Sequence, residues 1–355
     1  MLRQLEPELD NARAALAWAS THEPAWAVAL VQAMALALGA SRSPERRAVW
    51  EQTAALVTDA LPLPLPLRAR WHLGAGHPQA IAAQTRRERL QTALALYRQQ
   101  DDTVMVHRAI ADLLSMAAYL NDAESEALHA ERLALEAAAR AQGTLSNRQR
   151  LFAQQAEAFY RSARGERAAA DAAHQQMLVL ADQVGGHAFK STLLNNLADS
   201  ALADGRIDEA VQRGRERVGS LAGSRDRSGL AFARLNLANA LLAQGHTAAA
   251  REQALLGAPG AALFALQREW ADVLAGLAAQ QGRPHTAARL CGHADAAHAQ
   301  RDEVREHKDA RTRAQTEALA RATLGDADFK RLRQAGSGLG FAGACTLALA
   351  GDDAV

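Results

Sequence analysis

Cys291, Asp295 and His298 come closest to a metal-binding pattern in this chain. They stand at positions i, i+4 and i+7, so a helix would place a thiol, a carboxylate and an imidazole on one face. Zinc accepts all three groups, but a structural zinc site needs four ligands, and no second cluster supplies the rest at a suitable spacing. We therefore predict a small buried thiol beside surface polar residues, with no metal ion and no cofactor.

Two short motifs resemble phosphate-binding and dinucleotide-binding sequences, but the residues or the structure around each do not fit such a site. Lys190-Ser191 lacks the glycine that must precede the lysine of a phosphate-binding loop, because Phe189 stands there. We interpret this segment as a loop that enters a helix. The GxGxxG at 338–343 follows a helical pattern rather than the strand that a dinucleotide site requires, so we predict a turn before the last helix. No nucleophile stands in a recognisable catalytic motif either, and we predict no catalytic residue.

Arginines gather around one loop that also contains glycine and serine. Acidic residues are interleaved with them and aromatic residues are not, which leaves two interpretations: a solvated loop between helices, or a contact with phosphate or a partner. The formal net charge of the chain is only +1, so we predict no direct binding of nucleic acid. The cluster consists of Arg213, Arg215, Arg217, Arg225 and Arg227.

Asparagines form the one surface that we single out as a candidate binding site. The side chain of asparagine both donates and accepts hydrogen bonds, so a ladder of such residues could bind a peptide backbone or a carboxylate. The other interpretation is that Asn196 and Asn236 cap or bridge neighbouring helices. The candidate groove lies on the inner face of the first helix of each repeat described next, and comprises Asn195, Asn196, Asp199, Asn236 and Asn239.

The elements that would position this groove belong to a sequence repeat within residues 193–256. The segment Asn-Leu-Ala occurs at 196 and again at 236, and each copy continues to a glycine, Gly205 or Gly245, 40 residues apart. Leucine and alanine recur at helical spacing before each glycine, and glycine commonly ends a helix. Each copy is therefore a helix–turn–helix hairpin that must stack on neighbours to bury its apolar face. Weaker copies at Gly165 and Gly282 extend the prediction to about five hairpins.

Composition supports the same architecture. The chain has 355 residues, of which 49% are hydrophobic and only 4% aromatic, so alanine and leucine must fill the core. Closely packed helices suit such residues better than sheets do. We predict an all-α fold, a tetratricopeptide-like superhelical array of antiparallel hairpins. The alternating leucine and proline of 61–67 favour an extended connector. The predicted segments are an N-terminal helical block at 1–60, the repeat array at 68–290 and capping helices at 291–355.

Three features of the sequence bear on the location of the protein: its apolar runs, its first residues and its cysteines. The longest apolar run, 26–40, contains Gln32 and is shorter than the roughly 20 residues of a membrane span, so we expect a buried helix. The first residues are amphipathic and acidic, unlike a signal peptide. Two cysteines are too few for a disulfide framework. We expect a cytoplasmic protein that does not enter a membrane.

Four segments carry a resemblance to a known family. LDNARAALAWA at 9–19, ALALYRQQDD at 93–102, AARLCGHADA at 287–296 and LGDADFKRLRQAG at 324–336 occur in order around the repeats. Together they resemble the C-terminal tetratricopeptide-like region of bacterial STAND-type ATPase transcriptional regulators. In that family a DNA-binding domain and an ATPase domain come first, and this chain begins where the ATPase domain would end.

The resemblance implies a non-catalytic sensor region of a signal-transduction regulator. Its partners would be a protein or peptide, or a small ligand, bound in the groove, together with the ATPase and DNA-binding domains of a parent regulator. Two alternatives come from other classes: a stand-alone scaffold that assembles a protein complex, and an enzyme with an unrecognised site. A deep polar pocket with several perturbed titratable groups would favour the enzyme.

Overall fold

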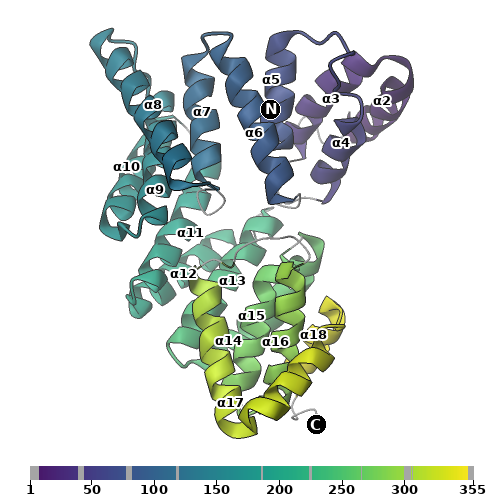
Figure 1. Ribbon diagram of the computed structural model, residues 1–355, viewed down its shortest axis with the longest axis vertical. Helices are drawn as coiled ribbons and strands as arrows, with labels where there is room; N and C mark the ends of the chain where they lie inside the picture. The colour runs from purple at the N-terminus through teal and green to yellow at the C-terminus, as the bar shows by residue number, and fades with distance from the viewer. Residues whose placement is uncertain are drawn as a thin grey trace. The chain divides into compact units, whose positions relative to one another are not determined.

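The computed structural model describes residues 8–38, 44–76, 82–116, 120–184, 187–223, 226–264, 266–299, 305 and 307–350. These residues form helices joined by turns, and no strand occurs among them (Figure 1). The predicted all-α fold is therefore confirmed, while the superhelical tetratricopeptide-like arrangement stays a prediction. The chain divides into two compact units, Met1–His187 and Ala188–Val355. Nothing tests the predicted division at 60, 68 and 290.

The first unit contains α2 (Leu9–His22), α3 (Pro24–Ala37), α4 (Pro44–Ala54), α5 (Leu65–Ala75), α6 (Ala83–Arg98), α7 (Thr103–Leu114), α8 (Asp122–Ala141), α9 (Asn147–Ala163) and α10 (Arg167–Gln183). Leucine and alanine fill most of its interior, and a few aromatic rings complete it. The rings of Trp50 and Trp71 meet edge to face, with centroids 6.2 Å apart. The Trp71 indole donates a hydrogen bond of 3.0 Å to the buried Thr53 hydroxyl, which satisfies the one polar atom of that ring.

Short polar residues begin three successive helices of this unit. The side chains of Asp102, Asn121 and Ser146 each accept a backbone N–H in the first turn of α7, α8 and α9. Such caps satisfy donors that have no partner within the helix. Asn121 therefore marks the start of α8.

The leucine–proline segment departs in part from its prediction. Pro64 is extended, with φ −53° and ψ 136°, but α5 already begins at Leu65. Pro66 lies in the first turn of α5, where its missing N–H costs nothing because that donor would have no helical partner. The prediction of an extended connector over all of 61–67 is therefore wrong for its last three residues.

The second unit contains α11 (His187–Ala203), α12 (Ile207–Leu221), α13 (Arg227–Ala243), α14 (Thr247–Leu263), α15 (Gln267–Gln280), α16 (Pro284–Ala299), α17 (His307–Gly336) and α18 (Phe341–Leu349). Three hairpins follow the repeat period, and each turn contains a glycine in the left-handed conformation. The φ angles are 76° at Gly205, 80° at Gly245 and 71° at Gly282. A residue with a Cβ rarely adopts this conformation, which explains why glycine marks each turn. Helix α11 includes Lys190 and Ser191, so they do not lie in a loop before a helix.

Two helices follow the hairpins and pack back on them. Helix α17 packs along α15 and α16 (Figure 1). Gly325 interrupts α17, because its φ of 73° is not helical. Helix α18 is held by arginines from the hairpins: Arg251 donates to the Leu349 carbonyl at 2.6 Å and Arg283 to the Leu347 carbonyl at 3.0 Å. The unpaired carbonyls at the end of α18 therefore find charged donors.

The apolar run at 26–40 coincides largely with α3. Val28, Val31 and Met34 are buried in the core, as predicted, although Trp26 at its start is 71% exposed. Within the described part of the chain, no helix combines the length and the apolar character needed to cross a membrane.

Candidate functional site

The predicted groove residues lie on α11 and α13, and most of them are buried. The exposed fraction is 6% for Asn195, 4% for Asn236 and 1% for Asn239, while Asn196 and Asp199 are half-buried. An open ladder of asparagines on a free surface is therefore not what the described chain presents. What covers part of this face is another helix of the same unit, α17.

Two residues of α17 contact two of the predicted groove residues. The Lys308 ammonium lies 2.8 Å from Oδ2 of Asp199 on α11. One turn later, the Thr312 hydroxyl donates a hydrogen bond of 3.2 Å to Oδ1 of Asn239 on α13. Positions i and i+4 share one face of a helix, so a single face of α17 brings Asp199 and Asn239 together.

Asn236 lies on the same face of α13 between two contacts with α17. Phe232, Asn236 and Asn239 stand at i, i+4 and i+7, which is one helical stripe. The Lys308 ammonium lies 5.3 Å from the centre of the Phe232 ring, and Thr312 bonds to Asn239. Both polar atoms of the buried Asn236 amide lack a hydrogen-bond partner in the described part of the chain. A buried polar group without a partner costs about 1–3 kcal/mol, so such groups need an explanation.

A glycine on α15 permits the close approach of α17. A Cβ added at Gly276 would lie 3.0 Å from Cγ2 of Thr312 and 3.2 Å from Leu242. Any larger side chain would push α17 away from α15 or force the neighbouring side chains to shift. We define the α17 cover as Lys308, Thr312 and their contacts to Asp199 and Asn239. The α17 cover depends on the small residue Gly276.

The three residues of the metal-like pattern have separate structural roles on α16. Cys291 is fully buried, and burial raises the pKa of its thiol to about 12. His298 Nε2 lies 3.1 Å from Oδ2 of Asp272, a fully buried carboxylate on α15. Among the described residues, no group of three or more His, Cys, Asp or Glu side chains is arranged to hold a metal ion.

Asp295, the third of these residues, anchors both halves of α17. Its carboxylate accepts hydrogen bonds from Arg305 at 2.7 Å, Arg313 at 3.1 Å and Arg333 at 2.7 Å. Burial opposes ionisation of Asp295, but the hydrogen bonds and charges of Arg313 and Arg305 outweigh it and lower its pKa. Asp295 is therefore ionised near neutral pH and ties α17 to α16.

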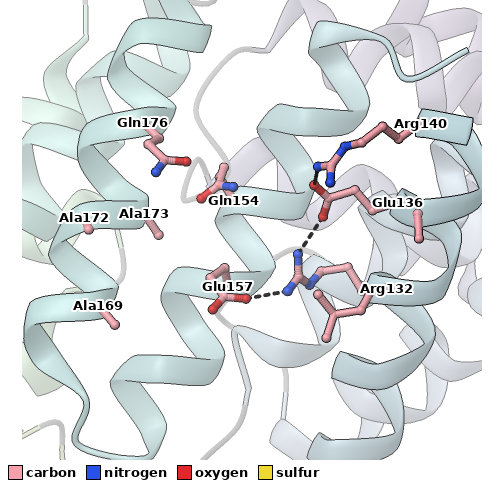
Figure 2. Close-up of a pocket in the computed structure, with 11 residues that line it drawn as sticks. Arg132, Glu136, Arg140, Gln154, Glu157, Ala169, Ala172, Ala173 and Gln176 are labelled. Carbon is pink, nitrogen blue, oxygen red and sulfur yellow. Dashed lines mark hydrogen bonds and ion pairs between the residues drawn. The ribbon is translucent and has the colours of Figure 1, made fainter. Parts of the chain in front are cut away.

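A cleft of about 650 Å³ lies in the first unit between one face of α8 and one face of α10, with α9 at its floor (Figure 2). Small side chains of α10 form one wall, and charged side chains of α8 and α9 form the other. Arg132 Nη1 lies 3.0 Å from Glu136, and Arg132 also pairs with Glu157. Arg140 pairs in turn with Glu136 at 2.9 Å. These charges neutralise one another and brace α8 against α9, so the cleft is better explained as structural than as a charged binding site.

Comparison with known proteins adds no family to this picture, because no family model and no curated protein matches the chain. The resemblance to STAND-type regulators therefore stays a prediction.

Sequence reasoning did not find the α17 cover. Lys308 and Asp199 are separated by 109 residues, and their types alone do not pair them. One weak signal exists: a stack of hairpins needs a terminal element to cover its last apolar face, and the amphipathic segment at 307–324 follows the last hairpin.

Proposed function

We propose that this chain is a non-catalytic sensor region of a bacterial signal-transduction regulator, and that the asparagine face of α11 and α13 is its binding surface. The observation that carries the proposal is the buried, unpartnered amide of Asn236, which stands on α13 between two residues that contact α17, Phe232 and Asn239. If α17 were the permanent occupant, an apolar residue at 236 would serve better. A polar partner that hydrogen-bonds to the Asn236 amide would gain the free energy of bonds that are missing while α17 is in place.

The contacts of α17 on this face include polar ones that a competing segment could replace, which suits an exchange of occupants. They include one ion pair, between Lys308 and Asp199, and one hydrogen bond, between Thr312 and Asn239. A competing segment that offered a cation to Asp199 and backbone amides to Asn236 and Asn239 would reproduce both and add a third. The partner class that fits is therefore a peptide segment with a basic side chain.

Signal transmission then follows from competition. A partner binds only when α17 has left the asparagine face, so it shifts the population toward the open form by its preference for that form. The movement of α17 would be the output passed to the rest of a regulator. In a STAND-type protein, which this chain resembles, that output would act on an ATPase domain. Other members of the signalling system are expected in the cytoplasm.

The test uses a display library of random peptides and two matched targets. The selecting target is the Lys308→Ala, Thr312→Ala variant, whose asparagine face is less firmly covered. The counter-target carries Asn236→Leu and Asn239→Leu in addition, which removes the recognition groups. We expect selected peptides to bind the first variant at least about tenfold more tightly than the wild type, because the wild type must release α17 first. Selected peptides that bind both targets equally would remove the support for this surface.

The assignment to a regulator needs its own experiment. We expect the gene to encode, in frame or in a neighbouring frame, an ATPase domain with a phosphate-binding loop, and expect the two parts to copurify. A partner peptide should then change the nucleotide turnover of that complex. If a peptide binds the asparagine face but does not change the nucleotide turnover, the chain is a scaffold and not a sensor.

A further inference from the structure

A cavity in the second unit lies apart from the asparagine face and contains a buried arginine. Its volume is about 510 Å³, within the range of small-molecule sites. Leu194 of α11 forms an apolar wall, and polar residues of α12 form the rest. The lining residues of α12 are Glu209, Gln212, Arg213, Glu216, Arg217 and Ser220.

Arg217 is the residue that this cavity leaves unexplained. It is only 6% exposed, and its Nη1 donates a hydrogen bond of 3.1 Å to the Ser220 hydroxyl. Its Nε and Nη2 are also buried, and neither has a hydrogen-bond partner. These two N–H groups point the same way along one edge of the guanidinium, which is the fork that binds both oxygens of a carboxylate. Burial lowers the pKa of Arg217, and the nearby Asp226 offsets only part of that effect.

Among the described residues, no carboxylate accepts a hydrogen bond from Arg217, although the nearby charge of Asp226 favours its ionised form. Glu209 accepts hydrogen bonds from Arg206 at 2.6 Å and from Arg213 at 2.8 Å, so its charge is compensated. Glu216 accepts a hydrogen bond of 3.0 Å from Gln212. Arg206 also pairs with Asp204 at 2.9 Å, so what the cavity leaves unmet is the pair of Arg217 N–H groups and not a surplus of charge. Buried N–H groups without an acceptor are costly, so such groups need an explanation, and a bound ligand can supply one.

We propose that this cavity binds a small organic carboxylate, whose two oxygens take the Nε and Nη2 groups of Arg217 and whose apolar part lies against Leu194. A carboxylate matches this planar fork, and Glu209 and Glu216 in the lining disfavour a dianion such as phosphate. Arg217 lines the cavity, but its Nε and Nη2 are buried, so the guanidinium must turn toward the ligand on binding. The site does not depend on displacement of α17.

Among the arginines clustered in the sequence, the structure distinguishes Arg217 from its neighbours. Arg215 and Arg227 are exposed, which agrees with a solvated surface, and Arg213 is half-buried and paired with Glu209. Arg217 alone of these four is buried. If the arginine cluster contacts an anion, Arg217 is therefore the residue that does so. Arg215, on the same helix, supplies a matched control.

The experiment measures thermal unfolding of the full chain with hexanoate, with its neutral isostere hexanamide and with inorganic phosphate, at matched ionic strength. We expect saturating hexanoate to raise the midpoint by roughly 3 °C and hexanamide to leave it unchanged. Slower amide exchange in α12 with hexanoate would locate the effect. A larger, Arg217-dependent shift with phosphate would overturn the carboxylate assignment, and no shift with either anion would overturn the site.

Two variants keep the result independent of folding defects. Arg217→Met replaces a buried guanidinium, two of whose N–H groups have no acceptor, with an apolar chain of similar length. This variant should unfold at the same temperature as the wild type or higher, and should lose the response to hexanoate. Arg215→Met should keep the full response. A hexanoate response that survives Arg217→Met would contradict the proposal, and so would a midpoint lowered by Arg217→Met, since Arg217 would then have a structural partner.

Discussion

Replacement of Asn236 by leucine should stabilise the second unit, which is an unusual expectation for a buried residue. The amide of Asn236 is 4% exposed, and neither of its polar atoms has a hydrogen-bond partner among the described residues. Leucine has the same branching, with a methyl group in place of each polar atom, and needs no such partner. The substitution removes an unmet desolvation cost of about 1–3 kcal/mol, so the free energy of unfolding should rise by about that amount.

Hydrogen exchange read by mass spectrometry measures this change within one unit of the chain. The most protected amides of α13 exchange through opening of the unit, so a gain of about 1–3 kcal/mol should slow them by a factor of roughly 5 to 150. Asn239→Leu is the matched control on the same face. Its Oδ1 accepts a hydrogen bond from Thr312, so the loss of that bond should give faster exchange rather than slower.

Faster exchange in Asn236→Leu would refute this reasoning. It would mean that the Asn236 amide has a stabilising partner, such as a buried water, when α17 is in place. The residue would then be a structural component of the closed form, and its value as a binding group would lose support. Slower exchange combined with weaker peptide binding would show a residue kept for function at the expense of stability.

Three further predictions concern the core, the α17 cover and the response to acid. Leu197→Ala should lower the stability of the second unit by about 2–5 kcal/mol, because Leu197 is only 2% exposed; a chemical melt showing less than about 1 kcal/mol would mean that it is not core. Gly276→Leu should expose the amides of α17 to faster exchange by pushing this helix off α15, whereas unchanged protection would show that the contact with Thr312 can adjust. Burial lowers the pKa of His174 to about 4, below its ordinary 6.5. Its neutral form is therefore the stabilised one, and the first unit should lose up to about 3 kcal/mol as the pH falls from 6.5 to 4. Acid melts of His174→Leu should show a shallower loss, and an identical profile would show that His174 is not the group that titrates.

The hairpins of the second unit could be predicted from the sequence because their causes are local. A glycine in the left-handed conformation ends the first helix of each hairpin, and the spacing of Gly205, Gly245 and Gly282 reveals the period. Alanine at 210 and 250 is buried, as expected where two helices approach closely. Each of these features depends on residues that are near one another in the chain.

The covered state of the asparagine face could not be predicted, because it depends on long-range packing. The groove residues were identified as a set, but the cover depends on contacts that span 109 residues, from Lys308 to Asp199, and 73 residues, from Thr312 to Asn239. The same limit applies to Arg217: its arginine neighbours look alike in sequence, and only the packed structure shows which one is buried. The prediction of an extended connector from the prolines at 62–66 was wrong in part for another reason. A helix tolerates proline in its first turn.

A disulfide can test whether α17 must leave the asparagine face before a partner binds. A Cβ at Gly276 would lie 3.0 Å from Cγ2 of Thr312, so Gly276→Cys with Thr312→Cys brings two Cβ atoms within a distance that a disulfide spans. The half-buried Cys345 is changed to serine, and Cys291 stays buried. Affinity for the peptides selected above is then measured in the oxidised and reduced forms, with the Thr312→Cys single variant as control. We predict that oxidation weakens binding at least roughly tenfold and that reduction restores it. Equal affinity in the two forms would contradict the account, because binding would then not require α17 to move.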